Sequence, residues 1–376
     1  MDIQDLDHYY MAKAIKLAKK GKYISMPNPY VGCVIVKNNN IIATGFTQIA
    51  GKAHAEVNAL DNAQETVENA TAYVTLEPCS HTGKTPPCAD SLVASGIKRV
   101  VIAMLDPNPL VSGRGLKKLV DAGIDVSVGV LEDQARLLNQ GFIKRMECNK
   151  PFVRVKMAMS LDGKTAMASG ESQWITGKEA RIDVQRLRAQ ASAILTGSGT
   201  LINDDPSLNV RLQVNDLNIE KGLLKEVLQP LRVVLDTDLK TKATAKLLSL
   251  SGNTLIYTCN NEKQKHQALE KTGAEIHACS SSQILLAEVL KDLASRQINE
   301  VHVEAGSTLC GALLAEQFVD EIVIYMAPTL LGGEAMSLFN IPQLHKMEDQ
   351  IKLEIKDIRA IGKDWRITAT PCYLVP

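Results

Sequence analysis

One histidine, one glutamate and two cysteines fall in two short segments of a chain that has only 7 histidines and 8 cysteines in 376 residues. The segment HAEVNAL places His54 two residues before Glu56, and the segment LEPCSHTGKTPPC contains Cys79 and Cys88. Zinc favours imidazole nitrogen and thiolate sulfur in tetrahedral geometry, and a catalytic zinc site keeps three protein ligands with a fourth position open to water. His54, Cys79 and Cys88 are therefore predicted to bind zinc.

Glu56 suits a general acid/base rather than a metal ligand. Zinc lowers the pKa of its bound water toward about 7, and a carboxylate above that water could pass a proton to a departing amine. HxE followed by PC and a second cysteine is the arrangement with which zinc deaminases attack the amine-bearing carbon of a nucleobase. Two other interpretations stay open: a closed zinc knot with His81 as the fourth ligand, or cysteines that only pack in a core.

The spacing between the two cysteines is longer than in the general deaminase signature, and the surrounding sequence resembles the RibD family of bifunctional riboflavin-biosynthesis deaminase/reductases. The matching segments are PNPYVGCVIV, HAEVNAL, LEPCSHTGKTPPC and MLDPNP. The resemblance implies removal of the 2-amino group of a diaminopyrimidinone ribosylamine 5′-phosphate. It assigns zinc binding to His54, Cys79 and Cys88, and proton transfer to Glu56.

The same resemblance implies that Asn28, His81 and Lys84 contact this substrate. An amide can read the polar edge of a pyrimidine, and a cation can meet a phosphate. By residue type alone, Asn28 between two prolines is equally a turn residue, and the other two are ordinary surface side chains. Thr47 stands where relatives often carry histidine, so no phosphate contact is predicted from that position.

The second half lacks a GxGxxG motif after a strand, so a standard dinucleotide fingerprint is missing. Gly306 follows the strand-like run NEVHVEA, and Ser307 and Thr308 open the next predicted helix. Free N–H groups at such a helix start could hold a cofactor phosphate. The segment LTGSGT at 195–200 has the same form, and both could equally be ordinary strand-to-helix turns.

Three segments of this half are similar to the reductase half of the same family: KMAMSLDGKTAMASGESQWIT, LRAQASAILTGSGTLINDDPSLNVR and VEAGSTLCGALL. The resemblance implies a dihydrofolate-reductase-like fold, NADPH as cofactor, and reduction of the ribosyl chain to a ribityl chain. The implied cofactor contacts are Ala158, Trp174, Thr200, Asp204, Gly306, Ser307 and Thr308. The implied substrate contacts are Ser172, Arg188, Leu208, Arg211 and Glu304.

Side-chain chemistry supports some of these assignments more than others. Arg188 and Arg211 suit a sugar phosphate, because a guanidinium can donate two charge-assisted hydrogen bonds to phosphate oxygens. Arg188 would equally suit a surface ion pair. Lys156 lies on the first strand of this half and is predicted to orient the ribose or to provide a proton. Trp174 could instead pack in a core, as tryptophan usually does.

Alternating strands and helices carry these residues, so the fold class is α/β. VGCVIV and IIATGF around KNNN predict a β-hairpin, and α/β alternation continues through both halves. The charged segment GFIKRMECNKP places a domain boundary near 148. We expect a cytidine-deaminase-like three-layer α/β domain over residues 1–147 and a dihydrofolate-reductase-like α/β domain over 148–376, with the weakly patterned segment 212–229 as a surface excursion.

Composition limits the class of protein. The chain is long enough for two domains at about 100 to 200 residues each, and 45% hydrophobic with 22% charged residues is typical of globular chains. A formal net charge of zero provides no basic field for nucleic acid or an anionic membrane. No apolar run of about 18 residues predicts a transmembrane helix, and the scattered cysteines favour a reducing cytoplasm.

The expected partners are small phosphorylated pyrimidine ribosides, and a symmetric homo-oligomer is the common state of such enzymes. Two other functions were weighed. A zinc deaminase acting on nucleic acid would need a basic, stacking surface, whereas residues 1–150 are nearly balanced in charge. A non-catalytic, zinc-stabilised binding module would have no need of Glu56.

Overall fold

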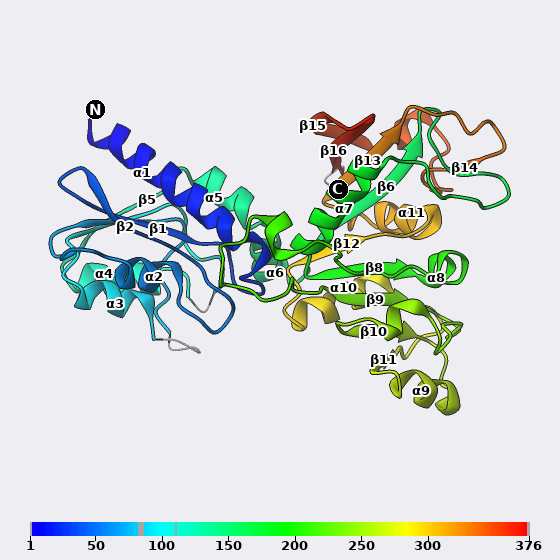
Figure 1. Cartoon of the computed structure of the whole chain (residues 1–376), viewed down its shortest axis with the longest axis horizontal. Helices are drawn as coiled ribbons and strands as arrows, with labels where there is room; N and C mark the ends of the chain where they lie inside the picture. Colours follow the sequence, from blue (N-terminus) through cyan, green and yellow to red (C-terminus); the bar gives the residue numbers. More distant parts are fainter. Residues whose placement is uncertain (1, 82–85, 110, 374–376) are drawn as a thin grey trace. The chain divides into compact units, whose positions relative to one another are not determined.

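The computed structural model describes residues 2–81, 86–109 and 111–373, and the chain forms two compact units. Unit 1 comprises residues 1–150 and 213–226, and unit 2 comprises residues 151–212 and 227–376. Figure 1 follows the chain through both units. The segment 213–226 holds a short 3-10 helix, Val214–Leu217, and buries Leu217 and Ile219. The compact units are therefore not two consecutive stretches of chain.

Unit 1 is built on a five-stranded sheet in the order β2-β1-β3-β4-β5. The strands are β1 (Gly32–Lys37), β2 (Asn40–Phe46), β3 (Thr71–Val74), β4 (Arg99–Ile102) and β5 (Asp125–Val128). β1 pairs antiparallel with β2 and β3, while β3, β4 and β5 run parallel. The predicted hairpin is confirmed, and its turn uses positive φ at Asn38 and Asn39, which asparagine tolerates better than most residues.

Helices cover both faces of this sheet, which gives the expected three layers. They are α1 (Ile3–Ala18), the 3-10 helix η1 (Lys19–Tyr23), α2 (Ala55–Asp61), α3 (Cys88–Ala94), α4 (Arg114–Asp121), α5 (Glu132–Leu138) and α6 (Gln140–Cys148). Figure 1 shows α1 and α5 on one side of the strands and α2, α3 and α4 on the other.

Two strand glycines allow these helices to pack closely against the sheet. A Cβ at Gly32 would lie 2.0 Å from the carbonyl oxygen of Ala14 in α1, and a Cβ at Gly45 would lie 2.2 Å from that of Ala55 in α2. Any larger residue would push the helix away. Gly45 therefore helps to set the depth of α2, the helix that begins next to His54 and contains Glu56.

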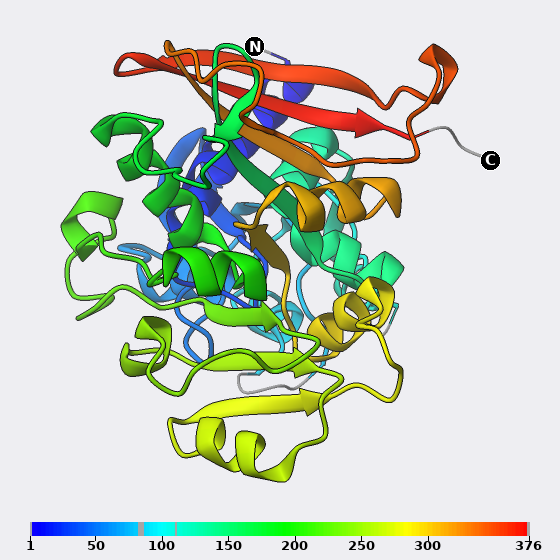
Figure 2. The ribbon, with the colours of Figure 1, turned by 90° about the vertical axis from the view of Figure 1, so that its right-hand side faces the viewer.

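Unit 2 contains a nine-stranded sheet in the order β11-β10-β9-β8-β12-β6-β13-β16-β15, which Figure 2 shows from the side. Its strands are β6 (Phe152–Ser160), β8 (Ala193–Gly197), β9 (Leu231–Leu235), β10 (Thr254–Thr258), β11 (Ala274–Ala278), β12 (Glu300–Val303), β13 (Glu321–Ala327), β15 (Lys352–Ile361) and β16 (Asp364–Cys372). The strands from β11 to β13 are parallel, and β16 and β15 continue the sheet antiparallel. A small second sheet pairs β7 (Lys164–Ala166) with β14 (Met336–Ser337).

The central strands of unit 2 are buried on both faces, as parallel strands covered by helices must be. Val233 and Leu255 belong to the core on one face, and Val234 and Ile256 to the core on the other. The helices are α7 (Lys178–Gln190), α8 (Ser198–Asp204), α9 (Lys263–Glu270), α10 (Leu286–Ser295) and α11 (Ser307–Ala315), with 3-10 turns η3 (Lys246–Ser249) and η4 (Met347–Asp349). Among the helices that the structure describes, none has the length and apolarity needed to cross a bilayer.

Candidate active sites

The predicted zinc ligands meet in unit 1. His54 lies immediately before α2, Cys79 follows β3, and Cys88 opens α3. Their ligand atoms all lie within 4.8 Å of one another: His54 Nδ1 is 3.6 Å from Cys79 Sγ and 3.3 Å from Cys88 Sγ. One imidazole and two thiols converging at this distance fit a tetrahedral zinc site that keeps one position for water.

Charge and burial at this site favour proton transfer. Glu56 is 4% exposed, and burial, reinforced by the negative charge of Cys79, raises the pKa of its carboxyl group to about 7. The pKa of Cys79 is lowered to about 4 by a hydrogen bond from the Cys88 thiol and another from His54. The hydrogen bond to Cys79 in turn raises the pKa of His54. A carboxyl group that titrates near neutral pH can both accept and release a proton.

The loop before α2 is fixed by the helix itself. The side-chain oxygen of Asn58 in α2 accepts hydrogen bonds from the Phe46 backbone N–H (3.1 Å) and from the Gln48 amide (3.3 Å). Thr47 is 2% exposed, and its hydroxyl oxygen accepts the Val31 N–H at 3.1 Å. Thr47 thus joins this loop to the residue that precedes β1.

The structure gives fewer contacts for the other predicted deaminase residues, Asn28, His81 and Lys84. Asn28 is half-buried in a turn where its N–H donates to the Ser25 carbonyl oxygen at 2.9 Å. His81 is exposed but near enough to Asp106 to affect the pKa of that residue. Lys84 lies outside the described residues. The substrate contacts of all three remain predictions.

Sequence reasoning missed two acidic residues beside the zinc ligands, Glu77 and Asp106. Burial raises the pKa of Asp106 to about 6, with the negative charges of Glu77 and Cys79 adding to the effect and His81 opposing it. The Asp106 N–H donates to Glu77 Oε2 at 3.1 Å, and Glu77 lies two residues before Cys79, so Asp106 borders the site. Both acids lie in the segments LEPC and MLDPNP that carry the family resemblance, yet the sequence alone did not separate their roles from those of their neighbours.

In unit 2 the predicted reductase residues cluster around Glu304, which follows β12. Arg188 of α7 donates to both of its carboxylate oxygens, from Nε at 2.5 Å and from Nη2 at 2.9 Å. Lys156 Nζ of β6 lies 3.4 Å from Glu304 Oε2. Burial lowers the pKa of Arg211, and the nearby positive charge of Arg188 lowers it further. The structure thus brings together four of the predicted substrate contacts.

The charges of this cluster are strongly coupled. Burial would raise the pKa of Glu304, but the adjacent charges of Arg188 and Lys156 outweigh it and hold that pKa well below its usual range. Arg188 also donates to the Asn209 carbonyl oxygen at 3.0 Å. The guanidinium of Arg188 is therefore already occupied by protein acceptors, whereas the exposed Arg211 bonds only to the side chain of Asn209 among its described guanidinium contacts.

The predicted cofactor residues lie mainly at two neighbouring strand ends. Thr200 and Asp204 lie on α8, which follows β8. Gly306 immediately precedes α11, and Ser307 and Thr308 form its first turn, after β12. β8 and β12 are adjacent parallel strands, so both turns lie at the same carboxyl edge, where open α/β sheets bind ligands.

Three further predicted residues have distinct environments. Ala158 is half-buried on β6, and Ser172 is half-buried in the loop before α7. Leu208 is 2% exposed and packs in the core, so only its backbone can face a ligand. Trp174 is 70% exposed with the Arg181 guanidinium 4.6 Å from its ring centre. The interpretation that Trp174 packs in a core was wrong.

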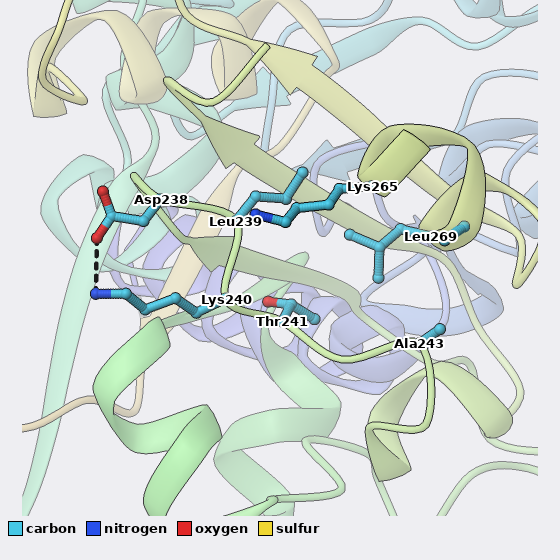
Figure 3. Close-up of a pocket in the computed structure, with 8 residues that line it drawn as sticks. Asp238, Leu239, Lys240, Thr241, Ala243, Lys265 and Leu269 are labelled. Carbon is cyan, nitrogen blue, oxygen red and sulfur yellow. Dashed lines mark ion pairs between the residues drawn. The ribbon is translucent and has the colours of Figure 1, made fainter. Parts of the chain in front are cut away.

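A separate cavity of about 500 Å³ lies in unit 2 between the loop after β9 and α9. Figure 3 shows Asp238 and Lys240 paired on its loop side, at 2.7 Å, and Lys265 on its helix side pairs with Glu262 at 2.8 Å. These cations already have acidic partners, and we assign the cavity no ligand.

Comparisons with known proteins match both units. Residues 4–104 match the family model of the cytidine and deoxycytidylate deaminase zinc-binding region, and residues 151–367 match that of the RibD C-terminal domain. The chain is 46% identical to the riboflavin biosynthesis protein RibD of Escherichia coli K12 over 95% of this chain and 97% of the relative. It is 46% identical to RibD of Haemophilus influenzae over 99% of both chains.

Solved structures agree over the full length. Acinetobacter baumannii RibD in crystal form 2 superposes with a TM-score of 0.90 at 44% identity, covering 99% of this chain and 100% of that chain. A Thermotoga maritima structure, described as a diaminohydroxyphosphoribosylaminopyrimidine deaminase/5-amino-6-(5-phosphoribosylamino)uracil reductase, superposes with a TM-score of 0.86 at 34% identity over 99% and 100%.

Fold and site together define a two-domain enzyme, with a zinc-dependent deaminase domain of the cytidine deaminase class and an NADPH-dependent reductase domain. The chain belongs to the RibD family of bifunctional riboflavin biosynthesis enzymes. The expected fold class, both enzyme classes and both cofactors are confirmed. The alternatives of a nucleic-acid deaminase and of a non-catalytic binding module are set aside.

Proposed function

We propose that this enzyme carries out two consecutive reactions: hydrolytic deamination of 2,5-diamino-6-ribosylamino-4(3H)-pyrimidinone 5′-phosphate, then NADPH-dependent reduction of the ribosyl chain to ribityl. Residues 1–147 would carry the deaminase and residues 148–376 the reductase. The observation that carries the proposal is the convergence of three zinc-ligand side chains beside the buried Glu56 carboxyl group.

In the deaminase, zinc held by His54, Cys79 and Cys88 would supply an activated water at the amine-bearing carbon. Glu56 would move the proton between the attacking water and the departing amine, which leaves as ammonia. Glu56 is buried and lies two residues from the ligand His54, where a carboxyl group can serve as both general base and general acid. Asn28, His81 and Lys84 would hold the pyrimidine and its phosphate.

In the reductase, NADPH bound against Ala158, Trp174, Thr200, Asp204, Gly306, Ser307 and Thr308 would supply a hydride to C1′ of the opened ribosylamine. Arg211 is the better phosphate ligand of the two arginines, because Arg188 already donates from Nε, Nη1 and Nη2 to Glu304 and Asn209. Lys156 and Glu304 would orient the ribose hydroxyls. Ser172 and the backbone of Leu208 would complete the substrate contacts.

One assay tests both activities and their order. Purified protein is supplied with the diaminopyrimidinone ribosylamine phosphate, with and without NADPH, while ammonia release and NADPH absorbance are followed together. We expect ammonia in both samples and NADPH oxidation only after deamination. Ammonia without NADPH oxidation would retain the deaminase and withdraw the reductase; neither signal from folded, zinc-replete protein would withdraw both.

The surroundings of the enzyme are also proposals. A reducing cytoplasm is supported by the eight cysteines, all of which are free thiols. The zero net charge supports small-molecule substrates without nucleic acid. A symmetric homo-oligomer is the common state of such enzymes, and light scattering on the purified protein would test it.

A further inference from the structure

Glu77 has an unusual set of hydrogen bonds for a residue with no assigned part in the reaction. It is 3% exposed, and its carboxylate accepts four backbone N–H groups. Oε2 accepts from Asp106 (3.1 Å) and Gly113 (3.0 Å), and Oε1 accepts from Gly115 (2.9 Å) and Leu116 (3.1 Å). A carboxylate with so many donors fixes the segments that supply them.

Three of these donors belong to the start of α4. Gly113 precedes this helix with φ of +76° and provides no side-chain cap. Without Glu77, the first N–H groups of α4 would be buried without acceptors, which is costly. The negative charge also lies at the helix end that favours it. Glu77 therefore caps α4 from a distant part of the sequence.

The same residue anchors the segment that leads to the zinc ligand Cys79. The Glu77 N–H donates to the Met104 carbonyl oxygen at 2.9 Å, at the end of β4. A Cβ on Gly115 would lie 1.9 Å from the Pro78 carbonyl oxygen, so α4 packs directly on the residue between Glu77 and Cys79. Residues 77–79 are thus held between the exit of β4 and the start of α4.

The fourth donor connects this arrangement to the edge of the deaminase site. Glu77 Oε2 accepts the Asp106 N–H at 3.1 Å, which holds Asp106 next to a residue that lies two positions before the zinc ligand Cys79. Asp106 also accepts the Asn108 N–H at 2.9 Å, which orders the turn after it. The position of Asp106 beside the zinc ligands therefore depends on Glu77.

We propose that Glu77 is a positioning residue of the deaminase, which holds Asp106 and the start of α4 against the Cys79 segment so that Asp106 borders the substrate. The proposal rests on the deaminase function proposed above. Because Asp106 borders the site without supplying a metal ligand, its displacement changes how substrate is held. Loss of the Glu77 carboxylate should raise KM more than it lowers kcat.

The variant Glu77→Gln tests this inference, because the amide keeps the volume but replaces one acceptor oxygen with an NH2 group facing two N–H donors. Exposed Glu65→Gln in the same unit is the matched control. Measurements are zinc content, deaminase kcat and KM by ammonia release, and reductase rate with the deaminated substrate. We expect stoichiometric zinc, a KM raised about tenfold or more, a smaller change in kcat, and an unchanged reductase rate.

The outcomes separate this inference from the proposed function. If the unmodified enzyme releases no ammonia, the deaminase function itself fails. If it does, and Glu77→Gln keeps both kcat and KM, Glu77 has no positioning role. Loss of zinc together with activity would also overturn the proposal, by making Glu77 a support of the metal ligand alone. Should Glu77→Gln not fold, Glu77→Asp keeps the charge at the helix start and is judged by the same criteria.

Discussion

Arg188 and Glu304 form a two-pronged ion pair, with Nε and Nη2 donating to separate carboxylate oxygens at 2.5 and 2.9 Å. Both side chains are about nine-tenths buried. Such a pair adds little net stability when complete, but removing Arg188 leaves the buried Glu304 carboxylate with the more distant Lys156, at 3.4 Å, as its cationic partner. In this enzyme the pair keeps Glu304 ionised at the site where the ribose is expected.

The substitution Arg188→Met should therefore damage the reductase and its stability together. We expect unfolding of unit 2 to be easier by about 3 to 5 kcal/mol, the usual cost of breaking a buried pair, and a marked loss of reductase activity. Exposed Arg186 on the same helix provides the control Arg186→Met. Thermal unfolding and NADPH oxidation measure both effects; unchanged stability would refute a buried pair.

The substitution Glu56→Gln should abolish deamination while zinc stays bound. An amide in place of this carboxylate cannot transfer the proton, and general acid/base catalysis typically contributes about 10²- to 10⁴-fold. Metal analysis and ammonia release would be compared with the reductase rate of the same preparation, which serves as the internal control. Loss of the metal, or unchanged turnover, would contradict the assigned role.

Arg211→Ala should mainly weaken binding of the reductase substrate. Its guanidinium is exposed and close to Arg188, a position suited to a phosphate. We expect a raised KM for the phosphorylated substrate, with NADPH affinity little changed, and a substrate analogue lacking the phosphate should not distinguish the variant from the parent. An effect confined to NADPH would place Arg211 elsewhere.

Trp174 should report NADPH binding directly. The chain has only 2 tryptophans, and Trp174 and Trp365 are both exposed, by 70% and 46%. We expect NADPH to quench the fluorescence of the parent enzyme and of Trp365→Phe, but to have little effect on Trp174→Phe. Because Trp174 is outside the core, Trp174→Phe should also leave the unfolding temperature nearly unchanged. Equal quenching in the two variants would remove Trp174 from the cofactor site.

Asp106 predicts a pH dependence of stability with an unusual sign. Its pKa in the folded protein is raised by burial to about 6 from an ordinary value of 3.8, so the folded state binds more protons than the unfolded state between these values. Stability contributed by this group is therefore lost as pH rises through that window. Asp106→Asn should be more stable than the parent by about 1 to 3 kcal/mol at pH 7.5 but not at pH 4.

Urea unfolding at both pH values, with the difference between variant and parent taken at each pH, checks this prediction. Acid affects the metal ligands of variant and parent alike, so this effect cancels when the difference between the two proteins is taken at each pH. A constant difference between variant and parent at both pH values would show that Asp106 does not titrate in this range.

Local pattern was enough to predict much of the fold. The hairpin of β1 and β2 and the strand-to-helix turn between β12 and α11 follow from apolar runs and turn residues close together in sequence. The antiparallel pair β15 and β16 was not predicted. β15 is largely exposed, so it lacks the buried face that gives a strand its sequence signal.

The site residues show the same difference between local patterns, which could be predicted, and contacts distant in sequence, which could not. His54, Cys79 and Cys88 were found because metal chemistry restricts the residue types and their spacing. Glu77 was not predicted, because its role depends on the backbone N–H groups of Asp106, Gly113, Gly115 and Leu116. Every residue except proline has such a donor, so the residue types give no signal. For Arg188 the sequence left a phosphate contact and a surface ion pair open, because the partner in the structure, Glu304, lies more than a hundred residues away in sequence.

The segment 213–226 returns to unit 1 after the chain has already entered unit 2. The polypeptide therefore passes between the units at three places, and cleavage at 150 would leave part of unit 1 on the larger fragment. A gene split at that point would encode a first product that lacks the segment 213–226. This product would be without the buried side chains of Leu217 and Ile219. Separating the two activities into independent proteins would require moving or replacing this segment as well as cutting the chain.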